Sequence, residues 1–201
     1  VIITGRSARD VLPLLGLSRS PEIWGCHGWE YLDSEGNYHP PRLEDEARMG
    51  LQLARRQVED LPQAHQRCEV KPAGVAFHVR GLHQQQARAL LRTVEARWRP
   101  VAQQSGLQLH PFDGGIELRV PGRDKGSVVR EILGPWDSQM VAAYLGDDLT
   151  DEDAFRAMRG RGMGVLVRSR LRPTAADVWI RPPQELLDFL ARWHREATSG
   201  R

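Results

Sequence analysis

An apolar run, MVAAYL, leads directly into the segment GDDLTDEDAF at residues 146–155, and this junction constrains the fold more than any other feature. Five of these ten residues are Asp or Glu. Carboxylates this close together repel one another, so a folded chain tolerates them only where a bound cation or the start of a helix offsets the repulsion. The junction therefore predicts a buried strand that ends in an acidic turn.

Strand and helix patterns alternate on both sides of a middle block that has a different texture. Apolar periodicity outside that block predicts strands over 1–5, 22–32 (around a tight glycine turn), 140–146, 163–167 and 177–180, and helices over 7–17, 126–134, 151–159 and 183–195. Ser7 is the expected N-cap of the first helix. Alternation of this kind implies βαβ units and hence a parallel sheet.

The middle block, about 43–119, shows helical periodicity over 47–61 and 87–101. It also contains two pairs of alternating segments, which predict hairpins that turn at 72–74 and 113–115. The order helix-strand-strand-helix-strand-strand suits a small α+β domain in which two helices cover one antiparallel sheet. We therefore predict an α/β core formed by residues 1–42 and 120–201, with residues 43–119 inserted.

Composition excludes several classes of function. The net charge of +2 is too small for a nucleic-acid groove, and arginine alternates with acidic residues along most segments. No apolar run approaches the roughly 18 residues that suggest a membrane span, and we expect no signal peptide. Cys26 and Cys68 form no CxxC pair and give no metal spacing, so we expect reduced thiols in a cytoplasmic protein.

The start of the chain is unusual. Residue 1 is Val instead of Met, and VIIT has the pattern of a buried strand that runs straight into a turn at Gly5. Core strands seldom begin at the first residue of a protein. We therefore expect further sequence upstream of Val1.

The two aspartates that open the acidic segment carry its chemistry. Ligands of an open parallel sheet bind at the carboxyl ends of the strands, where the pattern places Asp147 and Asp148. Thr150 is a candidate helix cap with Asp153 three residues on, but capping there leaves the two preceding aspartates unexplained. Paired carboxylates at a strand end suit Mg²⁺, and we favour that ion over capping alone. A calcium EF-hand loop fits poorly, because Glu152 stands where that loop needs glycine.

Two further segments are expected at the same edge of the sheet. Of 28 Lys and Arg residues, only Lys71 and Lys125 are lysines, and an ammonium is a compact point charge that arginine does not reproduce. Lys125, in RDKGSVV before a helix expected near Ser127, is a candidate to neutralise a phosphate or carboxylate; a plain surface loop is the alternative. In IITGR, the Thr4 hydroxyl and the turn amides can hold a phosphate oxygen. We expect these pieces to meet at one divalent ion and one phosphate.

Together these segments resemble the haloacid dehalogenase superfamily and, more narrowly, the trehalose-6-phosphate phosphatases. GDDLTDEDAF matches the family's last acidic motif almost letter for letter, and ITGR matches its Ser/Thr-Gly-Arg motif. GCHGWE (25–30) matches G-x-H-G-x-E, EVKPAGVAFHVR (69–80) matches the hairpin of the cap, and IELRV…DKGSVV matches E-x-R-P…x-K-G with Val120 splitting the R-P pair. The resemblance covers nearly the whole chain in order. It implies a Rossmann-like core whose inserted cap, residues 43–119, sets substrate specificity.

One departure from the family is large. The superfamily uses a D-x-D-G-T segment at the end of its first strand, with its first Asp as nucleophile and its second as general acid/base, and residues 1–201 contain no such segment. The family places it upstream of the Thr-Gly-Arg strand, which agrees with the expectation drawn from Val1. We therefore expect the chain as given to be inactive alone.

The resemblance implies a role for each matched residue. The catalytic set is Lys125, Thr4, Gly5, Asp148 and Asp151, and the Mg²⁺ ligands are Asp147 and Asp148. The substrate-binding set is Arg6, His27, Glu69, Lys71, His78, Arg80 and Glu117. Residues two apart on a strand share a face, so Glu69 should point with Lys71, and His78 with Arg80. A charged, solvated sheet face is the alternative for the strand residues, and turn stabilisation is the alternative for His27.

The complete protein is thus expected to hydrolyse trehalose 6-phosphate with Mg²⁺ through an aspartyl-phosphate. A trehalose-6-phosphate synthase is a candidate functional partner. One competing hypothesis is a non-catalytic sugar-phosphate-binding or regulatory module. Another keeps the fold and changes the substrate to sucrose phosphate, a mannosyl phosphoglycerate or a hexose phosphate.

Overall fold

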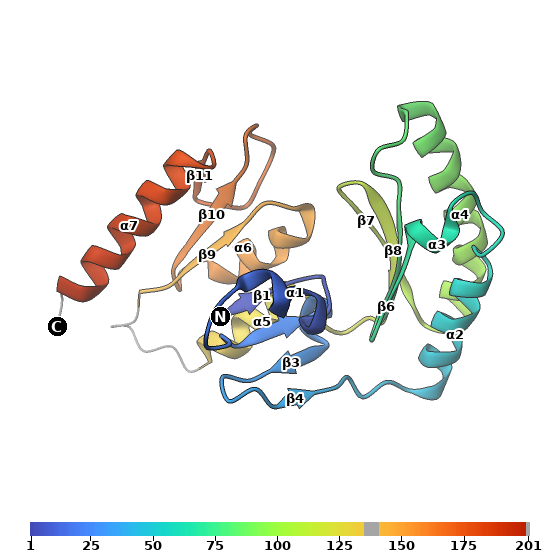
Figure 1. Cartoon of the computed structure of the whole chain (residues 1–201), viewed down its shortest axis with the longest axis horizontal. Helices are drawn as coiled ribbons and strands as arrows, with labels where there is room; N and C mark the ends of the chain where they lie inside the picture. The colour runs from blue at the N-terminus through green and yellow to red at the C-terminus, as the bar shows by residue number, and fades with distance from the viewer. Residues whose placement is uncertain (135–140, 200–201) are drawn as a thin grey trace. The chain divides into compact units, whose positions relative to one another are not determined.

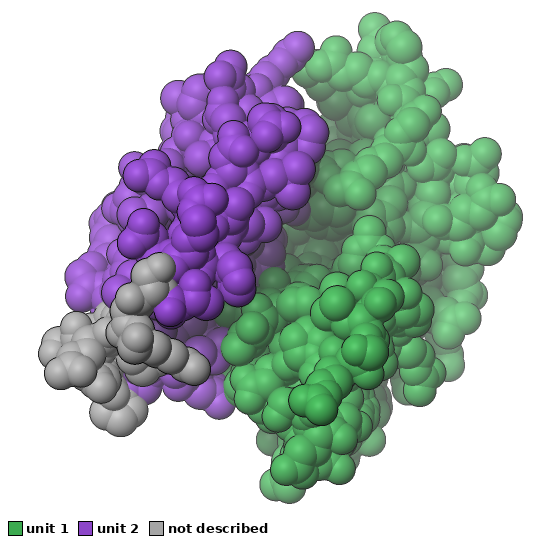
Figure 2. Space-filling view, turned by 60° about the vertical axis from the view of Figure 1, so that its left-hand side comes forward, with its two compact units in different colours: residues 1–124 green, residues 125–201 purple. Residues whose placement is uncertain are grey.

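The computed structural model describes residues 1–134 and 141–199. Two compact units make up the chain, Val1–Asp124 and Lys125–Arg201, shown separately by colour (Figure 2). Their elements are labelled in Figure 1. The predicted division into residues 1–42 with 120–201 and residues 43–119 stays a prediction.

The first part of unit 1 is a four-stranded mixed sheet with the order β1-β2-β3-β4. β1 and β2 are parallel and are joined through α1, whereas β3 and β4 continue antiparallel. Ser7 caps α1 as predicted, because its hydroxyl accepts a hydrogen bond from the Asp10 amide at 3.3 Å. The elements are β1 (Ile2–Ile3), α1 (Ala8–Leu15), β2 (Ile23–Gly25), η1 (Cys26–Gly28), β3 (Glu30–Leu32) and β4 (Tyr38–His39).

The rest of unit 1 is an antiparallel sheet with the order β5-β6-β8-β7, and α2 and α4 cover one face of it (Figure 1). Strand alternation sends Val75, Phe77, Ile116 and Leu118 toward these helices, where Trp98 is fully buried. The opposite face is polar. The elements are α2 (Asp45–Arg56), α3 (Ala64–Arg67), β5 (Cys68–Lys71), β6 (Gly74–His78), α4 (Gln84–Gln104), β7 (Gln108–Phe112) and β8 (Gly115–Arg119).

Unit 2 has a parallel sheet with the order β11-β10-β9, with α6 packed against β9 and β10 and against α5. A Cβ on Gly126 would lie 2.5 Å from the Asp153 carbonyl oxygen, so glycine lets α5 approach α6 closely. The elements are α5 (Lys125–Leu133), β9 (Ala143–Gly146), η2 (Leu149–Asp151), α6 (Glu152–Met158), β10 (Met163–Val167), β11 (Val178–Ile180) and α7 (Gln184–Ser199).

These elements confirm the predicted α/β class with a parallel sheet, and both predicted hairpins form. The predicted strand over 140–146 is observed as β9, and Met140 lies outside the described residues. Among the helices that the structure describes, none combines the length and apolar character that crossing a membrane requires.

Candidate active site

Asp151 organises the candidate residues of unit 2. It is 2 % exposed, and its Oδ1 accepts hydrogen bonds from Lys125 Nζ at 2.7 Å and from the Tyr144 hydroxyl at 2.6 Å. Its Oδ2 accepts from the amides of Asp147 and Asp148 at 2.9 and 2.8 Å. Burial raises the pKa of Asp151, but the Lys125 charge and these hydrogen bonds bring it below its usual value. Asp151 is therefore a buried anion that fixes the lysine and both preceding amides.

Lys125 and the acidic turn reach Asp151 because of where their elements begin and end. Lys125 is the first residue of α5, two positions earlier than the predicted helix start near Ser127. Gly146 ends β9, and a Cβ there would lie 2.4 Å from Asp151 Cγ. Glycine at this strand end therefore makes room for the aspartate side chain.

The cap of the acidic turn differs from the prediction. We expected Thr150 to cap the following helix, but Asp148 is the N-cap, and its carboxylate accepts from the Leu149 amide at 2.6 Å. Asp148 and Asp151 form a reciprocal capping box around η2. The prediction was wrong because a 3₁₀ turn precedes α6, so the first unpaired amides lie earlier in the chain. Capping thus accounts for Asp148 as well as Asp151.

Helix capping does not account for the carboxylate of Asp147. Burial raises its pKa, as do the neighbouring charges of Asp151 and Asp148, while Lys125 and Arg168 oppose the increase. A carboxylate held among other carboxylates favours a bound cation. Within the described residues, no group of three or more metal-ligating side chains gathers. Mg²⁺ takes one or two carboxylates from proteins when water and substrate oxygens complete its shell.

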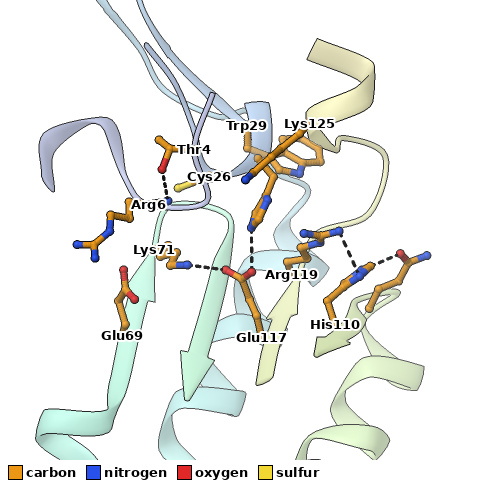
Figure 3. A network of polar contacts seen from close by, with 12 residues as sticks. Thr4, Arg6, Cys26, Trp29, Glu69, Lys71, His110, Glu117, Arg119 and Lys125 are labelled. Carbon is orange, nitrogen blue, oxygen red and sulfur yellow. Dashed lines mark hydrogen bonds and ion pairs between the residues drawn. The ribbon is translucent and has the colours of Figure 1, made fainter. Parts of the chain in front are cut away.

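The Thr-Gly-Arg turn of unit 1 follows β1, and Figure 3 shows its Thr4 and Arg6 side chains. Thr4 Oγ1 accepts from the Arg6 amide at 3.1 Å, and the Thr4 carbonyl accepts from the His27 amide at 2.9 Å. A Cβ on Gly5 would lie 2.7 Å from the His27 ring. Glycine is therefore needed at position 5, because the imidazole packs directly on the backbone of this turn.

The turn that presents His27 has a strained backbone. Cys26 and His27 have φ of 49° and 59°, which non-glycine residues rarely adopt. Glu30, 2 % exposed, supports the turn: it accepts from Cys26 Sγ at 3.3 Å, from the Ala8 amide at 2.6 Å and from the Tyr38 hydroxyl at 2.7 Å. Sequence analysis did not select Glu30, although a carboxylate within a strand pattern is a signal that it serves buried donors.

Glu117 is the centre of the polar face of the β5-β6-β8-β7 sheet (Figure 3). It is 4 % exposed, and its two oxygens lie 3.0 Å from His27 Nε2 and 2.8 Å from Lys71 Nζ. Burial raises the pKa of Glu117, but the hydrogen bond to His27 and the charge of Lys71 lower it to about 2. Lys71 reaches across β6 at Gly74, where a Cβ would lie 3.2 Å from Glu117 Oε1. The structure thus brings His27, Lys71 and Glu117 together.

Glu69 and His78 form a second pair on the same face, with 2.7 Å between Glu69 Oε2 and His78 Nε2. That hydrogen bond lowers the pKa of Glu69, although burial opposes the effect. Arg80 does not join them, because β6 ends at His78 and the Arg80 guanidinium donates to the Asp113 carbonyl at 2.9 Å. The alternation that paired Arg80 with His78 in the sequence therefore stops before Arg80.

Sequence analysis missed two further members of the polar face, Arg119 and His110. Arg119 is buried, and its Nη2 lies 3.2 Å from His110 Nδ1. The strand register places His110 opposite Glu117. Arg119 lies two residues after Glu117 on β8, so both side chains point to the same face of the sheet. The alternation in IELRV was the available signal for Arg119.

Solved structures define the class of fold. The chain superposes on the C-terminal domain of Candida albicans trehalose-6-phosphate phosphatase with a TM-score of 0.73, covering 93 % of this chain and 74 % of that chain at 18 % identity. It superposes on a haloacid dehalogenase-like hydrolase from B. subtilis with a TM-score of 0.53, covering 89 % and 81 % at 15 % identity. At these identities the likeness shows the fold alone, and that fold is shared with a haloacid dehalogenase-like hydrolase, as the sequence resemblance implied.

Sequence comparison narrows this class to a family. The model of the family described as trehalose-phosphatase matches residues 1–178. Trehalose-phosphate phosphatase of Mycobacterium marinum is 33 % identical over 205 residues, which cover 95 % of this chain and 50 % of the relative. A crystal structure described as a trehalose-6-phosphate phosphatase related protein has a TM-score of 0.69 at 26 % identity, covering 98 % of this chain and 82 % of that one. The chain belongs to the trehalose-phosphatase family, and it spans about half the length of the curated relatives it matches.

Proposed function

We propose that the complete protein hydrolyses trehalose 6-phosphate to trehalose and phosphate. The observation that carries this proposal is the buried ion pair of Lys125 and Asp151 at 2.7 Å, beside Asp147, in a chain of the trehalose-phosphatase family. Phosphoryl transfer depends mainly on positioning and on neutralising charge. An ammonium held in place by a buried carboxylate is a preorganised positive charge of the kind that stabilises such a transition state.

In this proposal Asp147 holds Mg²⁺, with Asp148 as a second ligand that also caps the acidic turn. The bound ion would neutralise negative charge on the phosphate oxygens. Asp151 orients this turn by accepting hydrogen bonds from the amides of Asp147 and Asp148. It also holds the Lys125 ammonium in place for the transferring phosphate. Thr4 and the Gly5 amide hold a phosphate oxygen.

We assign the nucleophile to a D-x-D-G-T segment upstream of Val1. Its first Asp attacks phosphorus, and the bond from phosphorus to the sugar oxygen breaks while the second Asp protonates that oxygen. Water then attacks the aspartyl-phosphate, with the second Asp as base, and releases phosphate. Residues 1–201 alone are inactive in this proposal, because the attacking carboxylate lies outside them.

The sugar is assigned to the polar face of the cap sheet. Glu117, Lys71, Glu69 and His78 offer charged donors and acceptors to sugar hydroxyls, and a site built for hydroxyls rejects ligands that leave those groups unpaired. His27 supports Glu117 through their hydrogen bond, and Arg6 and Arg80 complete the proposed substrate-binding set. This assignment makes residues 43–119 the cap and residues 1–42 with 120–201 the core, with hinges near 33–42 and 119–123.

A second candidate function has its own supporting observation. The chain superposes on the C-terminal domain of a Candida albicans trehalose synthase regulatory protein with a TM-score of 0.69, covering 92 % of this chain and 79 % of that one. At 13 % identity this likeness shows the fold alone. The alternative that we keep is a non-catalytic sugar-phosphate-binding or regulatory module without a nucleophile. We also propose a cytoplasmic location, which the free thiols of Cys26 and Cys68 support.

Phosphate release by the complete protein tests the proposal. We expect Mg²⁺-dependent turnover of trehalose 6-phosphate that exceeds turnover of sucrose phosphate, a mannosyl phosphoglycerate and glucose 6-phosphate. Lys125→Ala and Asp147→Asn should each abolish it. Normal turnover in both variants would defeat the mechanism, and preference for another member of the panel would change the substrate. If the gene lacks the D-x-D-G-T segment and no substrate is turned over, the regulatory alternative is favoured.

A further inference from the structure

The loop that follows β10 is tied to the acidic turn by two arginines. Arg168 Nη1 donates to the Asp147 carbonyl at 3.0 Å, and Arg172 Nη2 donates to the Asp148 carbonyl at 2.7 Å. The loop is itself anchored, because the Arg168 amide donates to the Ile180 carbonyl at 3.1 Å. Two segments about twenty residues apart therefore restrain each other through backbone carbonyls.

Arg172 has a second partner, which makes it a bridge. Its Nη1 pairs with Glu152 Oε1, and both side chains are 15 % exposed. Glu152 also accepts from the Thr174 hydroxyl at 2.8 Å and from the Ala175 amide at 2.7 Å. The Arg172 guanidinium thus connects the cap of the acidic turn, at Asp148, to the first turn of α6, at Glu152.

The two arginines also offset the repulsion within the acidic turn. Asp147, Asp148 and Asp151 repel one another, so the turn needs restraint and nearby positive charge. Arginines bonded to the Asp147 and Asp148 carbonyls restrain the backbone of the turn and place positive charge beside it.

We propose that Arg172 is a positioning residue of the acidic turn: by bridging the Asp148 carbonyl and the Glu152 carboxylate, it sets the backbone from which Asp147 and Asp148 bind a divalent cation. The inference rests on the proposed cation-binding role of these aspartates. A planar fork of donors is required, because the Asp148 carbonyl and the Glu152 carboxylate must be engaged together at fixed geometry. Lysine keeps the charge but does not supply this fork.

The experiment compares Arg172→Lys with Arg170→Lys in the complete protein. Arg170 is exposed and lies in the same loop, so it is a matched control for charge and position. Affinity for Mn²⁺, used as the probe ion, is measured by calorimetry, and thermal unfolding is followed on the same samples. Outer-shell partners of metal sites typically contribute about 10-fold or more to metal affinity. We expect Arg172→Lys to weaken Mn²⁺ binding about 10-fold with little change in unfolding temperature, and Arg170→Lys to change neither.

Other results have definite meanings. Mn²⁺ affinity of Arg172→Lys within twofold of wild type, or equal loss in both variants, overturns the proposal, as does absence of Mn²⁺ binding by the wild type. If Arg172→Lys does not fold, Glu152→Gln opens the same bridge from its other end and should weaken Mn²⁺ binding too. Unchanged affinity there also overturns it. Weakened Mn²⁺ binding without turnover of trehalose 6-phosphate by the wild type supports the positioning role and rejects only the proposed reaction.

Discussion

Each of the two lysines of the chain pairs with a buried carboxylate, but the surroundings of the two pairs are built differently. Lys125 Nζ lies 2.7 Å from Asp151 in unit 2, and Lys71 Nζ lies 2.8 Å from Glu117 in unit 1. Both lysine side chains are buried, and both carboxylates have a lowered pKa. The two lysine–carboxylate ion pairs therefore have nearly the same length and burial.

The difference lies in the distance along the chain between each carboxylate and its other partners. Asp151 accepts from donors 3, 4 and 7 positions away, namely the amides of Asp148 and Asp147 and the hydroxyl of Tyr144. Glu117 depends on Lys71 and His27, which are 46 and 90 positions away. The Asp151 centre is therefore organised mainly by its own segment, whereas the Glu117 centre requires the fold of unit 1 to be complete.

Removing the Lys125 ammonium should have the largest effect. In the complete protein, Lys125→Met should lower kcat by about 10²–10³-fold, because a preorganised charge at the transferring phosphate is lost. Local donors should keep Asp151 oriented. Steady-state kinetics for trehalose 6-phosphate measure this change.

Lys125→Arg is the matched control for charge, and denaturant unfolding controls for damage to the fold. We expect the arginine variant to stay well below wild type, because guanidinium and ammonium differ in shape and hydration. A Lys125→Met protein that keeps wild-type kcat and a wild-type unfolding midpoint would show that this lysine serves neither the reaction nor the acidic turn.

Low pH should lower the stability of the fold through protonation of Glu117. The pKa of Glu117 is about 2 when folded and near 4.5 when unfolded, so its contribution to stability is fully present above about pH 4.5 and is lost as pH falls toward 2. A pKa difference of this size corresponds to roughly 3 kcal/mol. Urea unfolding at pH 6, 5, 4 and 3 should therefore show a falling free energy of unfolding.

Glu117→Gln isolates this contribution, since Asp151 and Glu69 also have lowered pKa values and fall in the same direction. At pH 6 we expect the variant to be less stable than wild type, and the gap should narrow steadily as pH falls to 3. A gap that stays constant over this range would mean that Glu117 does not change protonation there.

Removing the other lysine should separate the two centres kinetically. Lys71→Met should raise KM for trehalose 6-phosphate by about 10-fold or more, because a hydrogen bond to a charged group is worth about 1.5–3 kcal/mol. Its kcat should fall less than that of Lys125→Met. Should kcat fall as much as in Lys125→Met while KM stays unchanged, Lys71 would belong to the chemical step and the contrast between the centres would fail.

The same contrast explains which features of the fold and of the candidate site could be predicted from the sequence. The alternating segments around 72–74 and 113–115 predicted both hairpins, because pleat and turn chemistry are encoded within a few residues. The acidic turn was placed correctly for the same reason. Its cap was assigned two residues late, since nothing in LTD distinguishes a 3₁₀ turn from the start of the α-helix.

The Glu117 centre was less predictable from residue patterns. The rarity of lysine singled out Lys71, but Glu117 and the pairing of the two came only through family resemblance, because no local pattern joins residues 46 positions apart. The left-handed backbone at Cys26 and His27 was missed, since such a conformation is usually marked by glycine or asparagine. Only the fold shows that buried Glu30 supports this turn.

The smallest expected effect tests whether the Asp151 centre is locally redundant. Tyr144→Phe removes one of the donors to Asp151 and keeps the ring, which packs edge to face on Phe155 with centroids 5.7 Å apart. We expect a loss of about 1 kcal/mol in the free energy of unfolding and little change in kcat, because Lys125 and two amides still hold the carboxylate. Tyr31→Phe, which loses a 3.1 Å hydrogen bond to Glu22 near the surface of unit 1, is the matched control and should change stability by less than about 0.5 kcal/mol. A fall in kcat as large as that of Lys125→Met would mean that the phenol is needed to orient Asp151, and the centre would then depend on one donor instead of on its own segment.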